Sequence, residues 1–214
     1  MRIVIIMLGL VFPAITIAQG AIDEIHVTSH VTFSTPVGTV TRNIVLIQDQ
    51  NGFLSRRVLA ASNSEGVSAL SSAGGQTFYT PQISFKYQDL SFFAGDLVEA
   101  SEASQVRADD LNAERPFSRS DGIAAVSVEV DALYLVPART VSISGFTAST
   151  RTVIKSQNGT SAPYFDGDAA GIPDDVTITA LEILNGGELL LSFDRSFAWN
   201  ELTIRPGDVV WHDG

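Results

Sequence analysis

Two stretches of this sequence decide the fold, because one resembles the other along its whole length. Residues 74–98 read GGQTFYTPQISFKYQDLSFFAGDLV, and residues 186–210 read GGELLLSFDRSFAWNELTIRPGDVV. They align without a gap, and the two Gly-Gly pairs and the two Gly-Asp pairs coincide. Self-similarity of this kind indicates a repeat architecture, in which related units pack against one another.

A second pair of related segments fills the intervals between these copies. Residues 22–25 (IDEI) resemble residues 130–133 (VDAL), and each segment leads through an alternating run to a Gln-Asn-Gly turn, at 50–52 and 157–159. The chain therefore reads A, B, A′, B′. The units span about 22–66, 67–129, 130–177 and 178–214, and we interpret them as one duplication of a two-unit module.

Each unit alternates short runs of Val, Ile, Leu, Phe and Thr with Gly, Asn, Asp and Pro, which is typical of β-strands joined by turns. In B′ the pattern predicts strands at 176–184, 188–193 and 208–212, with a hairpin turn at 185–187, where glycines tolerate positive φ. Residues 101–122 are polar and have no counterpart in B′, so we interpret them as an inserted loop or short surface helix. The fold class is all-β, either a small propeller-like ring or a sandwich or barrel.

One part of the chain resembles a known group of proteins. Residues 164–171 (YFDGDAAG), followed by residues 178–181, 187–192 and 207–210, are similar to the repeat of uncharacterised secreted bacterial β-repeat proteins. The resemblance covers residues 164–214, and it implies export and a β-repeat fold. It carries no catalytic residue that could be transferred to this chain.

The N-terminus has the features of a signal peptide. Arg2 precedes an unbroken apolar run at residues 3–12, and Pro13 and small residues follow, which predicts cleavage after Ala18 or, nearly as well, after Gly20. The rest of the chain, residues 19–214, has no apolar stretch near the ~18 residues of a membrane-spanning helix, and we interpret it as one β-repeat domain. We expect a secreted or periplasmic protein.

Composition limits the kind of partner. The chain has a formal net charge of -11 and no cysteine. Nucleic acids and anionic lipids require a basic surface, so both are poor candidates. Disulfides are excluded, and the core alone must stabilise the fold.

Acidic residues gather at one loop. Asp166, Asp168, Asp174 and Asp175 lie within ten residues that also contain Gly167, Gly171 and Pro173. Oxygen ligands on a glycine-rich loop suit Ca²⁺, which is the only cofactor that the sequence suggests. The alternative interpretation is that these side chains only order the loop by hydrogen bonding to backbone amides. The same turn-closing role is expected of Asp96 and Asp208.

Aromatic residues recur at equivalent positions, where Phe85 and Tyr87 align with Phe197 and Trp199. We expect the two phenylalanines to close the edge of the core. Tyr87 and Trp199 are then candidates for an exposed platform that contacts a ligand or partner, since such rings suit interfaces. The alternative is that both rings cover the loop end of the repeat.

No catalytic motif is recognisable, and no catalytic residue is predicted. The sequence therefore favours a non-catalytic binding or interaction module, whose partner is a glycan or another envelope or extracellular protein. The alternatives are a structural or surface-assembly component, and a hydrolase with a dispersed site.

Overall fold

The computed structural model describes residues 2–7, 24–29, 33–41, 44–49, 51, 53–59, 66–73, 76–87, 89–100, 105–184, 186–199 and 201–213. Strands make up 55% of the structure and helices 6%, so the prediction of an all-β fold is confirmed. Among these residues, no helix is long and apolar enough to cross a membrane.

Four sheets of three or four strands make up the body of the molecule. The first sheet contains β1 (Arg2–Met7), β2 (Glu24–Ser29), β5 (Ile44–Asp49) and β6 (Leu54–Val58). The second contains β7 (Val67–Ala73), β8 (Gln76–Pro81), β11 (Val98–Ala100) and β12 (Gln105–Arg107). The third contains β13 (Ile123–Val128), β14 (Leu133–Pro137), β17 (Thr152–Gln157) and β18 (Thr160–Asp166). The fourth contains β19 (Ile178–Ile183), β20 (Leu189–Phe193) and β23 (Val210–His212).

Each sheet carries a small hairpin between its second and third strands. The four hairpins are β3 (Phe33–Thr35) with β4 (Gly38–Val40), β9 (Phe85–Tyr87) with β10 (Leu90–Phe92), β15 (Val141–Ile143) with β16 (Phe146–Ala148), and β21 (Phe197–Trp199) with β22 (Leu202–Ile204). The same order of elements therefore recurs in all four sheets.

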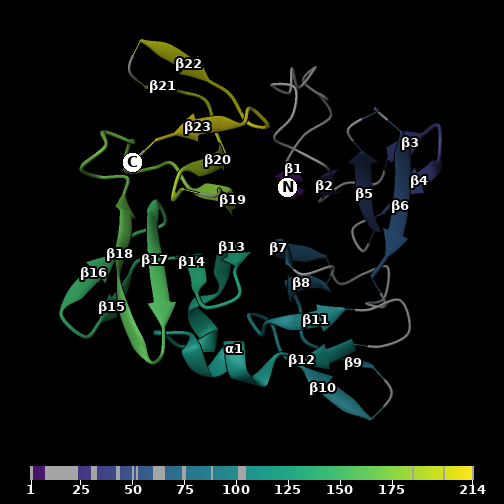
Figure 1. The fold of residues 1–214 in the computed structure, drawn as a ribbon, viewed down its shortest axis with the longest axis horizontal. Coiled ribbons are helices and arrows are strands. Elements are labelled where there is room, and N and C mark those ends of the chain that lie inside the picture. The colour runs from purple at the N-terminus through teal and green to yellow at the C-terminus, as the bar shows by residue number, and fades with distance from the viewer. Residues whose placement is uncertain are drawn as a thin grey trace.

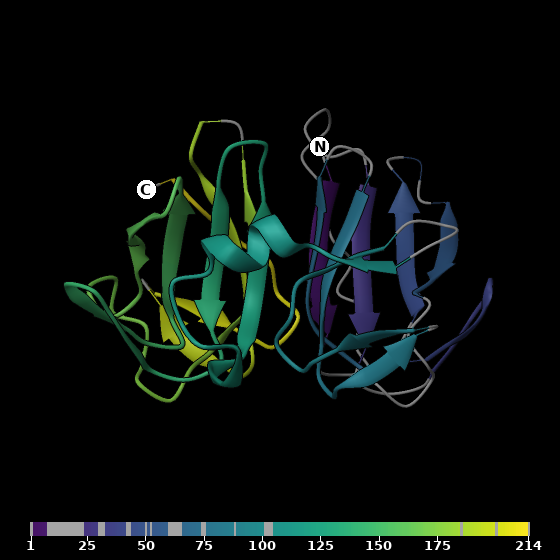
Figure 2. The ribbon, with the colours of Figure 1, turned by 90° about the horizontal axis from the view of Figure 1, so that it is seen from below.

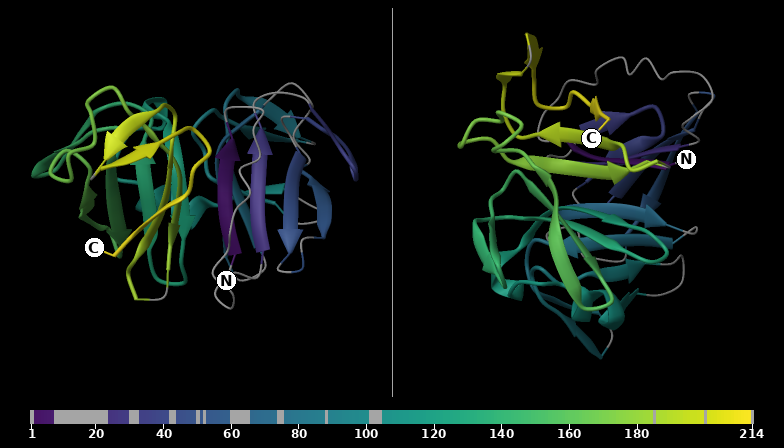
Figure 3. Two further views of the ribbon diagram at one scale, coloured as in Figure 1. Left: turned by 90° about the horizontal axis from the view of Figure 1, so that it is seen from above. Right: turned by 60° about the vertical axis from the view of Figure 1, so that its left-hand side comes forward.

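The four sheets lie around a common centre (Figure 1). Their first strands, β1, β7, β13 and β19, are innermost, and each contacts the first strands of the two neighbouring sheets. Figure 2, turned by 90°, shows strands of the sheets running along the direction of view of Figure 1. In Figure 3 the purple β1 lies beside the yellow-green fourth sheet, which completes the circle. Of the two architectures that the sequence left open, this arrangement corresponds to the propeller-like ring.

Burial on both faces of the third sheet explains the ring. Along β14, Leu133 and Leu135 belong to a core shared with the second sheet, while Tyr134 and Val136 belong to a core shared with the fourth sheet. Successive side chains of a strand point to opposite faces, so a continuous apolar run must be covered on both sides. Each sheet is too small to bury its own surfaces, and stacking against two neighbours is the solution.

The predicted turns are present at the described positions. Asn158 and Gly159 both have positive φ and connect β17 to β18 in a two-residue hairpin. This geometry favours Asn-Gly, because Asn and Gly adopt left-handed backbone conformations more readily than other residues. Gly186 and Gly187 also have positive φ between β19 and β20, whereas Asn185 lies outside the described residues.

The insertion at 101–122 is only partly a loop. It supplies β12 at the outer edge of the second sheet, the helix α1 (Asp109–Glu114) and the 3-10 turn η1 (Arg119–Asp121).

The boundary between the second and third sheets also differs from the expected one at 129/130. The strand β13 is hydrogen-bonded to β14, so the third sheet begins at Ile123.

The N-terminal segment that resembles a signal peptide includes β1, which pairs with β2 in parallel. The proposed cleavage sites after Ala18 and Gly20 lie outside the described residues. Removal of this segment stays a prediction.

Candidate functional site

The short helix α1 bridges the second and third sheets. On one side, the Asn112 side chain accepts a hydrogen bond from the Leu97 amide and donates one to the Leu97 carbonyl, both at 2.9 Å. On the other side, a carboxylate oxygen of Glu114 accepts a hydrogen bond from the Gly159 amide at 2.8 Å. The helix is therefore fixed to both sheets, and it forms one wall of a groove between them.

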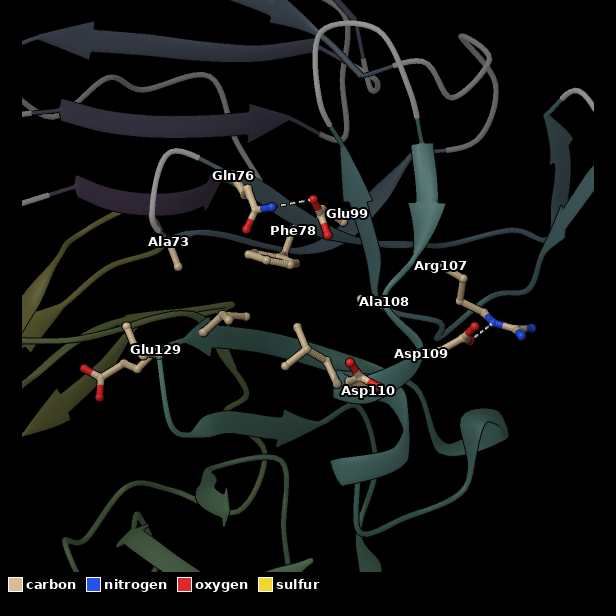
Figure 4. Close-up of a pocket in the computed structure, with 12 residues that line it drawn as sticks. Ala73, Gln76, Phe78, Glu99, Arg107, Ala108, Asp109, Asp110 and Glu129 are labelled. Carbon is tan, nitrogen blue, oxygen red and sulfur yellow. Dashed lines mark hydrogen bonds and ion pairs between the residues drawn. The ribbon is translucent and has the colours of Figure 1, made fainter. Parts of the chain in front are cut away.

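The groove contains a cavity of about 520 Å³, which Figure 4 shows in close-up. Phe78 of β8 lies on its floor, Gln76 and Glu99 stand on one side, and Asp110 of α1 stands on the other. Apolar groups supply the rest of the surface, and they are Ala73, Ala108, Leu111, Val128 and Val130. The site therefore combines an apolar base with polar groups at its rim.

Charges in this cavity are mostly negative. The amide of Gln76 donates to Glu99 at 2.6 Å, which fixes that carboxylate, and Arg107 forms an ion pair with Asp109 at the outer end. Among the described residues, Asp110 has no hydrogen-bonding or ion-pair partner for its carboxylate. The guanidinium of Arg107 is thus already neutralised, whereas Asp110 is available to a cation.

Glu129 lies at the opposite end of the cavity, at the end of β13, with its carboxylate turned away from Phe78 (Figure 4). Partial burial raises its pKa above the ordinary value of 4.5, and the positive charge of Lys155 partly opposes that rise. A positive neighbour stabilises the ionised form of such a half-buried carboxylate, because its charge compensates for the hydration lost on burial.

A second cavity of about 290 Å³ continues the groove along α1 toward the third sheet. The two cavities share Asp110, Leu111, Glu129 and Val130. Their combined lining has six carboxylates, which are Glu99, Asp109, Asp110, Glu114, Glu129 and Asp131, and one cation, which is Arg107. We call this continuous surface the acidic groove.

The four aspartates predicted to bind calcium do not converge. The side chain of Arg151, which is only 8% exposed, forms ion pairs with Asp168 and Asp174. Arg195 pairs with Asp175 at 2.9 Å, and Asp166 accepts hydrogen bonds from the amides of Asp168 and Ala169.

Within the described ranges, no three His, Asp or Glu side chains are grouped so that they could hold a metal ion. The loop is therefore ordered by arginine and by its own amides, in line with the alternative interpretation given above.

The aromatic platform is not present as predicted. Trp199 is only 6% exposed, its indole N–H donates to the Ala170 carbonyl at 2.8 Å, and its ring stacks on His212. Tyr87 is half-buried and packs against the hydrophobic core that the second sheet shares with the third. In this hairpin Trp199 is the buried ring and Phe197 is half-buried, whereas in the other copy Phe85 is the buried ring and Tyr87 is half-buried.

The turn-closing role of Asp96 and Asp208 is confirmed. A carboxylate oxygen of Asp96 accepts from the Phe93 amide, and one of Asp208 accepts from the Arg205 amide, both at 2.8 Å. Asp96 is completely buried and also forms an ion pair with Arg119 at 2.7 Å.

The residues of the acidic groove were missed at the sequence level because they come from separate strands and from the insertion. One signal was available, since an insertion that is present in only one repeat often lies on a binding face. That insertion contributes Asp109 and Asp110.

No protein-family model matches the chain, and no curated protein is significantly similar to it. The functional conclusion therefore depends on the geometry of the acidic groove.

Proposed function

We propose that this protein is an exported, non-catalytic binding module that uses the acidic groove to bind a basic, extended segment of a partner protein. The observation that carries the proposal is the combination of an apolar floor at Phe78 with six carboxylates and a single, already paired cation. A lysine or arginine side chain fits such a surface, because its apolar stem packs on the floor while its charged head meets a carboxylate.

The shape of the groove favours an extended segment over a small cation. Two cavities lie end to end along α1, and carboxylates recur along both of them. Val130, which lines both cavities and is 99% exposed, offers a further apolar contact. A glycan is less well supported, because the ring that could have stacked on a sugar, Trp199, is buried.

The net charge of the chain supports the same partner class. With a formal charge of -11, the protein attracts basic partners over a distance set by the ionic strength. Association is therefore expected to be faster and tighter at low salt.

Fluorescence anisotropy with a labelled hexapeptide of alternating Lys and Leu tests the proposal, and a Glu-Leu hexapeptide of equal length is the control ligand. The Lys-Leu peptide should bind, and the double variant Asp110→Asn, Glu129→Gln should weaken binding by on the order of tenfold, since each exposed charge pair contributes up to about 1 kcal/mol.

The matched control variant is Asp89→Asn, which removes a negative charge at an exposed turn away from the groove. It should leave binding unchanged. If Asp89→Asn weakens binding as much as the groove variant does, attraction is only due to net charge and the assignment of the groove is wrong. Equal binding of the Glu-Leu peptide contradicts the proposal as well.

A further inference from the structure

The centre of the ring contains a hydrogen bond that repeats from one first strand to the next. The amide of Val128 on β13 donates to the Ser71 hydroxyl on β7 at 2.9 Å, and both groups are buried. The amide of Ile183 on β19 donates to the Ser127 hydroxyl on β13 at 3.3 Å, again in a buried position. Each first strand thus offers a side-chain oxygen to the backbone of the following one.

Glu182 on β19 is the third member of this series. Ser71 is opposite Phe78 on the second strand of its sheet, Ser127 is opposite Tyr134, and Glu182 is opposite Leu190 in the same register. The next first strand around the ring is that of the first sheet. Yet Oε2 of Glu182 is buried and has no hydrogen-bond partner among the described residues, so the series stops one bond short.

The strand at that position is β1, which differs from the other three first strands. β7, β13 and β19 are antiparallel to the second strands of their sheets, whereas β1 is parallel to β2. A strand that runs in the other direction presents its amides in a different pattern. Moreover, β1 (Arg2–Met7) lies in the segment that the sequence predicts to be removed.

The processed chain cannot refill this position from its own N-terminus. After cleavage at Ala18 or Gly20, at most the five residues 19–23 precede β2. In the third sheet, the connection between β13 and β14 alone takes the four residues 129–132. Too few residues are left to pair along β2, so its inner edge becomes an unpaired strand edge.

The fourth sheet turns an apolar side chain toward this position. Leu190 is 8% exposed, although it belongs to neither of the two described cores. Its neighbours Leu189 and Leu191 face the third sheet, so alternation turns Leu190 toward the first sheet and β1. An occupant therefore needs apolar side chains as well as a free backbone N–H for Glu182.

We propose that, in the processed protein, the position between β2 and the ring centre is a slot that binds an extended apolar segment of a partner protein, antiparallel to β2. The segment adds a strand to the sheet and donates an amide to Glu182, which completes the hydrogen-bond series. The slot is separate from the acidic groove, and the inference depends on removal of the N-terminal segment.

Mass spectrometry of the exported protein is the first test. A mature terminus at Gln19 or Ala21 is expected, and an intact Met1 overturns the inference because β1 then stays in place. The probe is a peptide with the sequence of β13, Ile-Ala-Ala-Val-Ser-Val, followed by an acidic tail for solubility, which the acidic groove does not bind. It should bind the mature protein saturably and raise its melting temperature, while the same peptide with proline at its fourth position should do neither.

Disulfide cross-linking tests the register. The chain has no cysteine, so no native thiol competes with an introduced one. Residues 22–25 align with 130–133, so His26 corresponds to Tyr134, which is opposite Ser127 in β13. A peptide with cysteine in place of its serine should form a disulfide with the His26→Cys protein and not with the Thr28→Cys protein. Equal cross-linking at both positions overturns the proposed direction.

Variants at Glu182 separate a specific contact from general burial. Glu182→Ala should weaken peptide binding by about tenfold, and Glu182→Gln should retain it, because the amide oxygen still accepts a hydrogen bond. Asp110→Asn should have no effect, which distinguishes the slot from the groove. Absence of peptide binding, or a stable dimer of the mature protein that excludes the peptide, overturns the proposal.

Discussion

Replacing Glu182 with glutamine is expected to stabilise the full chain at neutral and alkaline pH. Burial, together with the nearby carboxylate of Glu129, raises the pKa of Glu182 from the ordinary value of 4.5 to about 8. The Ser127 hydroxyl, which interacts with the carboxyl group but leaves its Oε2 without a partner, opposes this rise without cancelling it. At pH 7 the folded protein therefore keeps this carboxyl group protonated, whereas the unfolded chain ionises it.

The sign of the effect follows from proton binding. Between pH 4.5 and pH 8 the folded state binds one more proton at Glu182 than the unfolded state does, so the free energy of unfolding falls as the pH rises. The slope is about 1.4 kcal/mol per pH unit, which amounts to about 3 kcal/mol lost by pH 7. Glutamine does not ionise and avoids this loss.

Urea unfolding of the full chain at pH 5, 7 and 9 measures the effect. The Glu182→Gln protein should differ little from the parent at pH 5 and be more stable by about 3 kcal/mol at pH 7. Glu201→Gln is the matched control, because Glu201 is exposed and should change stability little at any pH. A constant difference between parent and Glu182→Gln across the three pH values refutes the reasoning.

Three further predictions concern the core, the aromatic residues and the arginine-ordered loop. Leu190→Asp should prevent folding, because a buried unpaired charge costs several kcal/mol, and a soluble variant with an unchanged melting temperature contradicts the burial of Leu190. Trp199→Ala should lower stability by about 3–5 kcal/mol in thermal or urea unfolding, while Tyr87→Ala should cost clearly less, since only Trp199 is fully covered. Arg151→Met should lower the melting temperature, because it leaves Asp168 and Asp174 without their shared cation, whereas millimolar Ca²⁺ added after EDTA should not shift the melting temperature of the parent. A rise of several degrees with Ca²⁺ restores the calcium interpretation.

Local features of the fold were readable from the sequence because they depend on neighbouring residues. The hairpin at Asn158-Gly159 and the turn closed by Asp208 each involve residues only a few positions apart. Strands β19, β20 and β23 of the last unit were also predicted within two residues of their observed ends, whereas the hairpin of β21 and β22 was not predicted. Backbone preferences and side-chain alternation are sufficient for such assignments.

The candidate site was not readable in this way. Phe78, Asp110 and Glu129 come from a strand, an inserted helix and a strand end that only packing of two sheets brings together. The aspartates predicted to bind calcium illustrate a related point, because Arg151 is distant in sequence from Asp174 and forms an ion pair with it in space. A cluster of like charges along a chain does not reveal which distant cations approach it.

The sequence by itself determined the all-β class, the recurrence of short strands and turns, and the charge that favours basic partners, since all three are properties of local pattern or composition. Only the tertiary structure decided that four sheets close into a ring, because closure depends on both faces of the third sheet being covered by neighbours. It also decided that Trp199 is buried while Asp110 is open to solvent, and that Oε2 of Glu182 is buried at the ring centre without a hydrogen-bond partner among the described residues. Burial and pairing of a side chain are set by residues far away in the chain, and for that reason they emerge only when the sheets pack.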